Sequence, residues 1–297
     1  MTLLAMTPQE YCQEKAAKSG SSFYYSFLSL PDEKRDAIIA VYAFCREVDD
    51  VVDSKADPGI KSTKINWWHE EIKNLYSGQP QHPITLALKP VVATFNLPEE
   101  YFQEILDGMN MDLQQQRYTD FKELGLYCYR VASVVGLMSA EIFGYQDRRT
   151  LKYANDLGMA FQLTNIIRDV YDDISNDRIY IPQDELERFG VTEQELREQK
   201  HSEAFQRLMA YQVERAKSYY KKAFEQLPES DRFTQRTGII MAEIYHTLLD
   251  EIVNDGCHVL TKRISLPPLR KLWIAWKTKR KENKRHKRWL KQHALAG

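Results

Sequence analysis

Apolar residues recur every three or four positions along most of this 297-residue chain, a spacing typical of amphipathic helices. Prolines such as Pro31, Pro58, Pro98 and Pro228 separate these stretches and mark joints between helices. No segment alternates apolar and polar residues between turn residues, so the pattern requires no strands. We expect helices over residues 32–53 and roughly 61–77, 83–95, 98–117, 120–142, 147–175, 192–226 and 230–262.

The chain has no short repeat and no low-complexity linker. Its composition changes only near the end, where a basic segment begins. The pattern therefore predicts an all-α, single-domain bundle over residues 1–268 with its site among the helices, followed by a basic tail over residues 269–297.

The first unusual helix carries REVDDVVD, in which four acids occur within seven positions. At about 100° per residue, Tyr42, Arg46, Asp49 and Asp53 share one narrow face. Like charges at helical spacing destabilise a helix, so either water or a bound cation must offset their repulsion.

A second helix, in FQLTNIIRDVYDD, repeats the arrangement. Gln162, Asn165, Asp169 and Asp173 share a similar face, and Arg168 flanks it as Arg46 flanks the first. A single DxxxD pair is usually a solvated helix face. Two copies with arginine in register favour a metal site instead.

Paired carboxylates one turn apart suit Mg²⁺, which accepts one or two carboxylates and completes its shell with water and phosphate oxygens. Two facing pairs would hold several ions around a diphosphate, and the arginines would add charge-assisted hydrogen bonds. An apolar cavity would protect a carbocation from water. Its candidate lining, although each residue is individually more typical of ordinary core, is Phe23, Phe27, Val131, Val135, Leu137, Met138, Leu157 and Leu163.

The composition fits a core-forming protein, with 43% hydrophobic and 28% charged residues. We find no apolar run of the roughly 18–20 residues that cross a bilayer, and no signal peptide at the start. The four cysteines form no CxxC pair, which favours a reducing compartment. We therefore expect a cytoplasmic protein.

The tail has a composition of its own. From Arg270 onward, eleven Lys and Arg oppose one acid, and Trp273, Trp276 and Trp289 lie among them. This mixture predicts peripheral contact with anionic lipid on the inner face of the cell membrane. A solvated end and a nucleic-acid arm are the alternatives, and we expect no nucleic acid.

The motifs resemble those of the head-to-head prenyl synthases, the squalene and phytoene synthases. The similarity covers nearly the whole chain before the tail and appears in the family's order. The matching segments are SGSSFYYSFLSLP (19–31), AVYAFCREVDDVVD (40–53), LYCYRVASVVG (126–136), FQLTNIIRDVYDD with RIYIP (161–182), and YHTLLDEI (245–252).

The resemblance implies an isoprenoid-synthase helical bundle with a central apolar cavity. It looks closest to the bacterial presqualene diphosphate synthases of the hopanoid pathway. The expected reaction joins two farnesyl diphosphates into presqualene diphosphate with two or three Mg²⁺ ions and without NADPH. A downstream squalene-forming enzyme is a candidate partner.

The resemblance also assigns roles to residues. It implies metal binding by Asp49, Asp53, Asn165, Asp169 and Asp173, and catalysis by these aspartates together with Tyr127, a candidate proton acceptor beside the released diphosphate. Ser133 replaces a glycine common in the family, which leaves local packing open. The implied substrate-binding residues are Ser22, Phe23, Phe27, Tyr42, Arg46, Gln162, Asn165, Arg168, Arg178, Tyr245 and Arg263.

Several alternatives remain open. Phytoene synthase, which joins two geranylgeranyl diphosphates, and dehydrosqualene or squalene synthase need the same motifs. A head-to-tail synthase is possible because DDVVD fits DDxxD, although the two-helix pattern with QLTNIIRD favours head-to-head coupling. A carboxylate-bridged metal bundle needs two Glu-x-x-His elements, and only Glu243–His246 is present. A membrane adaptor would depend on the tail alone.

Overall fold

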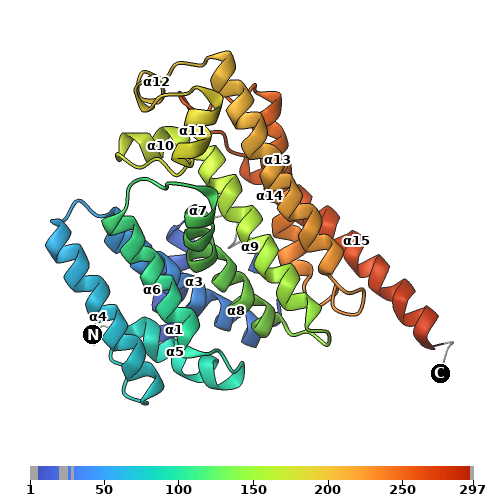
Figure 1. The fold of residues 1–297 in the computed structure, drawn as a ribbon. Helices are drawn as coiled ribbons and strands as arrows, with labels where there is room; N and C mark the ends of the chain where they lie inside the picture. Colours follow the sequence, from blue (N-terminus) through green and yellow to red (C-terminus); the bar gives the residue numbers. More distant parts are fainter. Residues whose placement is uncertain (1–5, 20–25, 28–29, 295–297) are drawn as a thin grey trace.

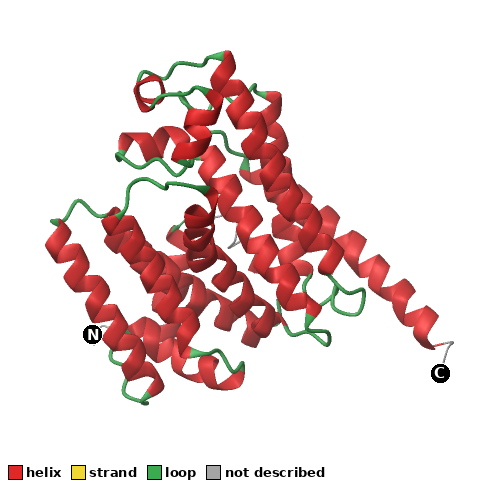
Figure 2. Cartoon of the chain, viewed as in Figure 1, coloured by secondary structure: helices red, strands yellow, loops and turns green. Residues whose placement is uncertain are grey.

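The computed structural model describes residues 6–19, 26–27 and 30–294. Within these ranges the ordered elements are helices, and no strand is formed, as the pattern predicts (Figure 2). The elements are α1 (Pro8–Lys18), α3 (Asp32–Asp53), α4 (Pro58–Tyr76), α5 (Pro83–Thr94), α6 (Glu99–Gln114), α7 (Phe121–Cys128), the π-helix η1 (Tyr129–Ser133), α8 (Val134–Phe143), α9 (Arg149–Arg168), α10 (Val170–Ser175), α11 (Gln183–Phe189), α12 (Glu193–Arg197), α13 (Glu203–Gln226), α14 (Arg236–Asn254) and α15 (Pro268–Ala294).

The helices form two packed groups with separate apolar cores (Figure 1). Helices α1 and α3–α6 surround a core that includes Phe44 and Phe102. Helices α7, α9, α13 and α14 surround a second core that includes Phe205 and Leu249. Helix α8 contributes to both cores, so it joins the groups. The all-α bundle is therefore confirmed.

Three predicted helices are interrupted. Residues 120–142 contain η1, residues 147–175 break at Asp169, and residues 192–226 break near Gln199, which has φ of 56°. The apolar periodicity continues through each break, which is why the sequence predicts single helices. The first two interruptions lie beside residues that the motifs single out.

Helices η1, α8 and α9 approach closely because glycines face neighbouring backbone. A Cβ on Gly136 would lie 2.5 Å from the Ala154 carbonyl oxygen, and one on Gly158 would lie 2.6 Å from that of Ala132. Ser133 is fully buried at the same contact, where its hydroxyl donates to the Asn155 carbonyl oxygen at 2.8 Å. The serine is thus accommodated by a hydrogen bond.

The segment Phe121–Phe143 is long and apolar enough to cross a membrane by length and composition, contrary to our expectation that no such run exists. A few charged residues interrupt the run, which hides its length from inspection. In the structure it is divided into α7, η1 and α8, which contact α6 and α9 inside the bundle. Core burial accounts for its apolar character.

Helix α15 contains most of the basic tail and packs against α14. Ile274, Thr278 and Glu282 are buried in this contact. Arg232 and Glu282 form an ion pair at 3.0 Å there. One face of the tail is therefore fixed to the bundle.

Candidate active site

The first acidic wall lies on the uninterrupted last turns of α3. Arg46 donates to Asp49 Oδ2 at 2.6 Å and to Asp50 Oδ1 at 3.0 Å. Asp53 accepts a hydrogen bond at 2.9 Å from Arg178, which follows α10. Arginines from both sides of the cavity therefore offset part of the repulsion among these acids.

The second acidic wall lies where α9 passes into α10. Asp169 ends α9 with φ of −99° and ψ of 11°, and the Tyr171 N–H donates to the Val259 carbonyl oxygen at 3.1 Å. This hydrogen bond replaces the backbone bond that the Tyr171 N–H would donate within a continuous helix. Asp169 accepts hydrogen bonds from Arg168 Nε at 2.7 Å and from Arg263 Nε at 2.6 Å.

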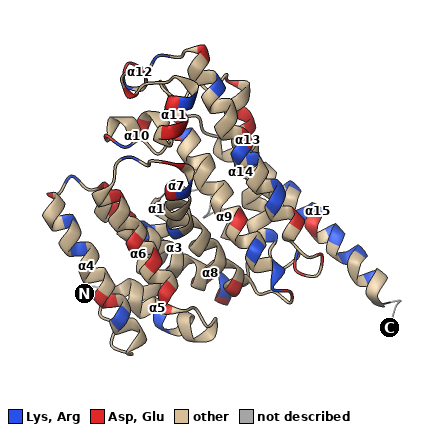
Figure 3. Ribbon diagram, in the orientation of Figure 1, with Lys and Arg blue, Asp and Glu red and all other residues tan. Residues whose placement is uncertain are grey.

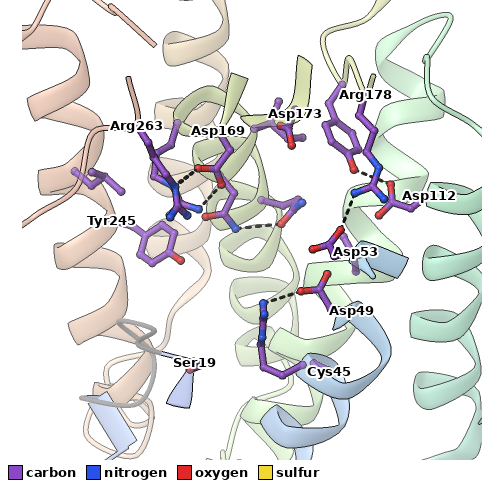
Figure 4. Close-up of a pocket in the computed structure, with 18 of the residues that line it drawn as sticks. Ser19, Cys45, Asp49, Asp53, Asp112, Asp169, Asp173, Arg178, Tyr245 and Arg263 are labelled. Atoms are coloured by element: carbon purple, nitrogen blue, oxygen red, sulfur yellow. Dashed lines mark hydrogen bonds and ion pairs between the residues drawn. The ribbon is translucent and has the colours of Figure 1, made fainter. Parts of the chain in front are cut away.

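Both walls face one cavity of about 510 Å³ between the helix groups (Figure 4). Ser22 and Phe23 lie outside the described residues, and Phe27 lines an adjoining cavity. The predicted site residues that line the main cavity are Tyr42, Arg46, Asp49, Asp53, Tyr127, Gln162, Asn165, Arg168, Asp169, Asp173, Arg178, Tyr245 and Arg263.

The pKa values of Asp49, Asp169 and Asp173 are shifted in different directions. Burial, aided by the charge of Asp53, raises the pKa of Asp49 to about 6 although Arg46 opposes the shift. Burial and the charge of Asp169 raise the pKa of Asp173 to about 8. Burial also acts on Asp169, but hydrogen bonds from Arg168 and Arg263 lower its pKa below the usual value. Arg46 therefore relieves the repulsion at Asp49 only in part, and Asp173 has no ion pair among the described residues.

The donor set fits hard divalent cations. Asn165 Oδ1 is buried and has no hydrogen-bond partner among the described residues, while its amide donates to Gln162 at 3.2 Å. An oxygen left without a donor beside repelling carboxylates matches the ligands that Mg²⁺ prefers. No three acidic, histidine or cysteine side chains enclose a single point within the described ranges. Oxygens from a ligand would therefore have to complete each shell.

The sequence analysis missed Asp112 at the side of this cavity. The hydroxyl of Tyr127 donates to Asp112 Oδ2 at 2.9 Å, and that of Tyr180 donates to Oδ1 at 2.7 Å. Burial raises the pKa of Asp112 to about 6. A signal was available, because Met109 and Phe102 share the buried face of α6 with this acid.

Two further cavity residues were missed. Ser19 lines the cavity, where its Oγ accepts a hydrogen bond from Tyr42 at 3.0 Å. Lys271 at the start of α15 lines the same cavity and adds a cation to the four arginines. The site therefore extends into a segment that the sequence analysis placed in the tail.

An apolar cavity of about 190 Å³ adjoins the acidic one. The two share the lining residues Tyr42, Cys45, Val131, Gln162 and Asn165. The predicted lining is correct for Phe27, Val131, Val135 and Leu157. Leu137, Met138 and Leu163 do not line either cavity, because their faces pack into the helix cores.

A family model for squalene/phytoene synthase matches residues 16–270. The 15-cis-phytoene synthase of Synechocystis is 33% identical over 282 residues, which are 90% of this chain and 84% of that protein. Other relatives from cyanobacteria and plants, at 32–34% identity, are also named phytoene synthase.

Solved structures give the same fold. A dehydrosqualene synthase in complex with a ligand has a TM-score of 0.82 at 27% identity, covering 93% of this chain and 97% of that one. Squalene synthase HpnC from Alicyclobacillus acidocaldarius has a TM-score of 0.76 at 27% identity, covering 84% and 94%.

These findings confirm the resemblance and correct the expected reaction. The more similar relatives are named phytoene synthase, which overturns the expectation of a presqualene diphosphate synthase acting in squalene and hopanoid synthesis. The error has a physical reason, because the motifs that suggested it handle diphosphate and metal. Both reactions need those groups, so the motifs carry little information about the product.

Proposed function

This chain belongs to the squalene/phytoene synthase family, and from that premise we propose that it is a phytoene synthase that joins two geranylgeranyl diphosphates head to head. The similarity to phytoene synthases along 88–91% of the chain supports the choice of product. Enzymes of this family are prenyltransferases.

One observation carries the reaction class: two acidic walls and four arginines line the same cavity. Acidic walls alone would repel a diphosphate. We propose that Asp49, Asp53, Asn165, Asp169 and Asp173 hold Mg²⁺ ions, which would neutralise the leaving diphosphate as Lewis acids. The arginines can then bind the remaining diphosphate oxygens.

The chain's own residues have distinct tasks in this proposal. Arg46 and Arg178 each pair with a wall carboxylate, so they already lie where diphosphate oxygens would meet metal ligands. Binding the diphosphate exchanges part of those ion pairs for contacts with substrate. Arg263 and Lys271 offer further cations at the α15 side of the cavity.

The adjoining apolar cavity accommodates prenyl chain and excludes water from a carbocation. Tyr127 lines the acidic cavity close to this chamber, and its hydroxyl donates to buried Asp112. We propose that the phenol oxygen accepts a proton from the coupled intermediate while its own proton moves to Asp112. The released diphosphate is the alternative acceptor.

The test is product identification by mass spectrometry. Purified protein receives geranylgeranyl or farnesyl diphosphate with Mg²⁺ and no NADPH. We expect a C40 hydrocarbon, phytoene, from geranylgeranyl diphosphate and much slower turnover of farnesyl diphosphate. Asp49→Asn should abolish the product, whereas Asp50→Asn, one position along α3 and outside the cavity lining, should not.

Two results would contradict the proposal. A C30 product formed efficiently from farnesyl diphosphate alone would refute the substrate assignment but keep the head-to-head reaction. A longer linear diphosphate would refute head-to-head coupling itself.

A further inference from the structure

The outward face of α15 is unusually apolar for a surface helix. Leu269, Leu272, Trp273 and Trp276 are 80%, 44%, 55% and 57% exposed. At about 100° per residue these four span about 100° of the helix, opposite the buried stripe that begins at Ile274. The side of α15 away from α14 therefore presents a contiguous Trp/Leu patch.

Cations continue this outward face along the helix. Lys284, Lys287 and Lys291 follow the Trp/Leu patch on the same side, and Figure 3 shows Lys and Arg along α15. Within the described ranges, only Arg270 and Arg285 of α15 form ion pairs with acids. Lys284, Lys287 and Lys291, which are exposed and form no ion pair with a described acid, can meet an external anion.

Two of the tryptophans lie against cations of the same face. Lys277 stands 4.8 Å from the centre of the Trp273 ring, and Arg280 stands 5.4 Å from that of Trp276. Aromatic rings beside long cationic side chains are typical of the boundary between lipid headgroups and acyl chains. A nucleic-acid surface would not need the exposed leucines.

The start of α15 also contributes to the acidic cavity. Ser265, Leu266 and Lys271, which flank the start of α15, line the acidic cavity. From there α15 extends beyond the bundle to the C-terminus (Figure 1). A surface bound along α15 would therefore contact an element that also lines the cavity.

We propose that the outward face of α15 docks the protein on an anionic phospholipid bilayer, with the Trp/Leu patch in the headgroup boundary and the lysines on lipid phosphates. A bilayer satisfies both parts of the face at once. It also brings the start of α15, which lines the acidic cavity, to a surface that can supply and receive apolar chains.

Vesicle co-sedimentation of the full chain tests this surface without substrate, so the result does not depend on the proposed reaction. Vesicles of phosphatidylcholine with an equal amount of phosphatidylglycerol are compared with pure phosphatidylcholine. We expect at least tenfold stronger partition onto the anionic vesicles, and loss of most of it in 0.5 M salt, because salt screens exposed charge.

Two pairs of variants separate the parts of the surface. Trp273→Ala with Trp276→Ala should weaken vesicle binding at least tenfold, whereas Trp67→Ala, exposed on α4, should not change it. Lys284→Gln, Lys287→Gln and Lys291→Gln together should remove the preference for anionic lipid. The matched triple change at exposed Lys64, Lys122 and Lys152 should preserve it.

The following outcomes would overturn the proposal. If wild-type protein stays in the supernatant with both kinds of vesicle, α15 does not form a membrane-docking surface. Equal binding by the double-tryptophan variant and the Trp67 variant would remove the role of the Trp/Leu patch. Stronger binding to duplex DNA than to vesicles, unaffected by the tryptophan changes, would assign α15 to nucleic acid. Circular dichroism and turnover in detergent, expected to be unchanged, confirm that the variants fold.

Discussion

The two acidic walls share a DxxxD spacing but differ in backbone and in charge. On α3 the helix is continuous, and an arginine reaches across the cavity to Asp53. At the α9–α10 junction the helix breaks at Asp169, and arginines from two segments neutralise that residue. Asp173 has no ion pair among the described residues, and its pKa rises to about 8.

This difference shows that DxxxD spacing alone does not set the pKa of a carboxylate, and so does not set how readily it loses its proton to bind a metal ion. Each wall includes one acid whose pKa is raised, Asp49 or Asp173, and Arg46 offsets the shift at Asp49 only in part. Strongly shifted carboxylate pKa values cluster at functional sites. The walls therefore offer two strained positions on opposite sides of one cavity.

The largest expected effect comes from removing these two acids. Asp49→Asn and Asp173→Asn should each lower turnover about 100- to 1,000-fold, because each deletes a charged metal ligand at the reacting diphosphate. Steady-state kinetics at saturating Mg²⁺ measures the loss. Circular dichroism should show an unchanged helical fold.

Their neighbours provide matched controls. Asp50→Asn and Asp172→Asn remove an acid one position away on each wall without changing the cavity lining. Activity should stay within a few-fold of wild type. Near-normal turnover of Asp49→Asn or Asp173→Asn would remove that residue from the metal site.

The second prediction distinguishes the two acidic walls by the pH dependence of Mg²⁺ binding. Mg²⁺ binds the deprotonated carboxylate, so a group with its pKa near 8 must release a proton first. Mg²⁺ affinity should rise up to about tenfold between pH 7 and pH 9 and level off above that. Calorimetric titration with Mg²⁺ and a diphosphate analogue measures it.

Asp173→Asn should abolish this rise above pH 7, whereas Asp49→Asn should retain it. The Asp49 pKa of about 6 limits its own contribution to lower pH. A wild-type affinity that is flat from pH 6 to pH 9 would contradict the assignment of Asp173 as a ligand.

A smaller effect concerns Asp112, which belongs to neither wall. Tyr127→Phe and Asp112→Asn should each slow turnover about tenfold with little change in KM, because both disturb one proton path. The double variant should be no slower than either single one, since residues that act as a unit are not additive. Additive losses would show that the two residues act independently, and unchanged turnover in both single variants would assign the proton to diphosphate.

Much of the fold and site could be predicted from the sequence. Helix periodicity placed Asp49 and Asp53 on one face and Asp169 and Asp173 on another. The prediction holds for the second pair although α9 ends at Asp169, because the Asp173 N–H still donates to the Asp169 carbonyl oxygen as in a continuous helix. The sequence does not show which distant segments pack against each other. That Arg178 would meet Asp53 is set by how two distant segments pack.

Other features depend on contacts without a local pattern. The π-helix η1 interrupts a normal apolar run, and Asp112 is recognisable only as an acid on a buried helix face. The substrate's chain length depends on cavity shape, whereas the motifs describe its diphosphate. The sequence analysis therefore found the chemistry of the site but misjudged the product.

The smallest expected effect is on stability. The pKa of Asp173 is raised in the folded state, so the metal-free protein loses stability as pH rises from about 4 toward 8, where the unfolded chain is already ionised. Asp173→Asn removes this penalty and should raise Tm by roughly 2–4 °C at pH 8 in EDTA. The gain should shrink toward pH 5.5.

Adding Mg²⁺ should stabilise wild type more than the variant, because only wild type retains the full ligand set. A variant less stable than wild type at pH 8 without metal would show that Asp173 contributes to the fold rather than strains it.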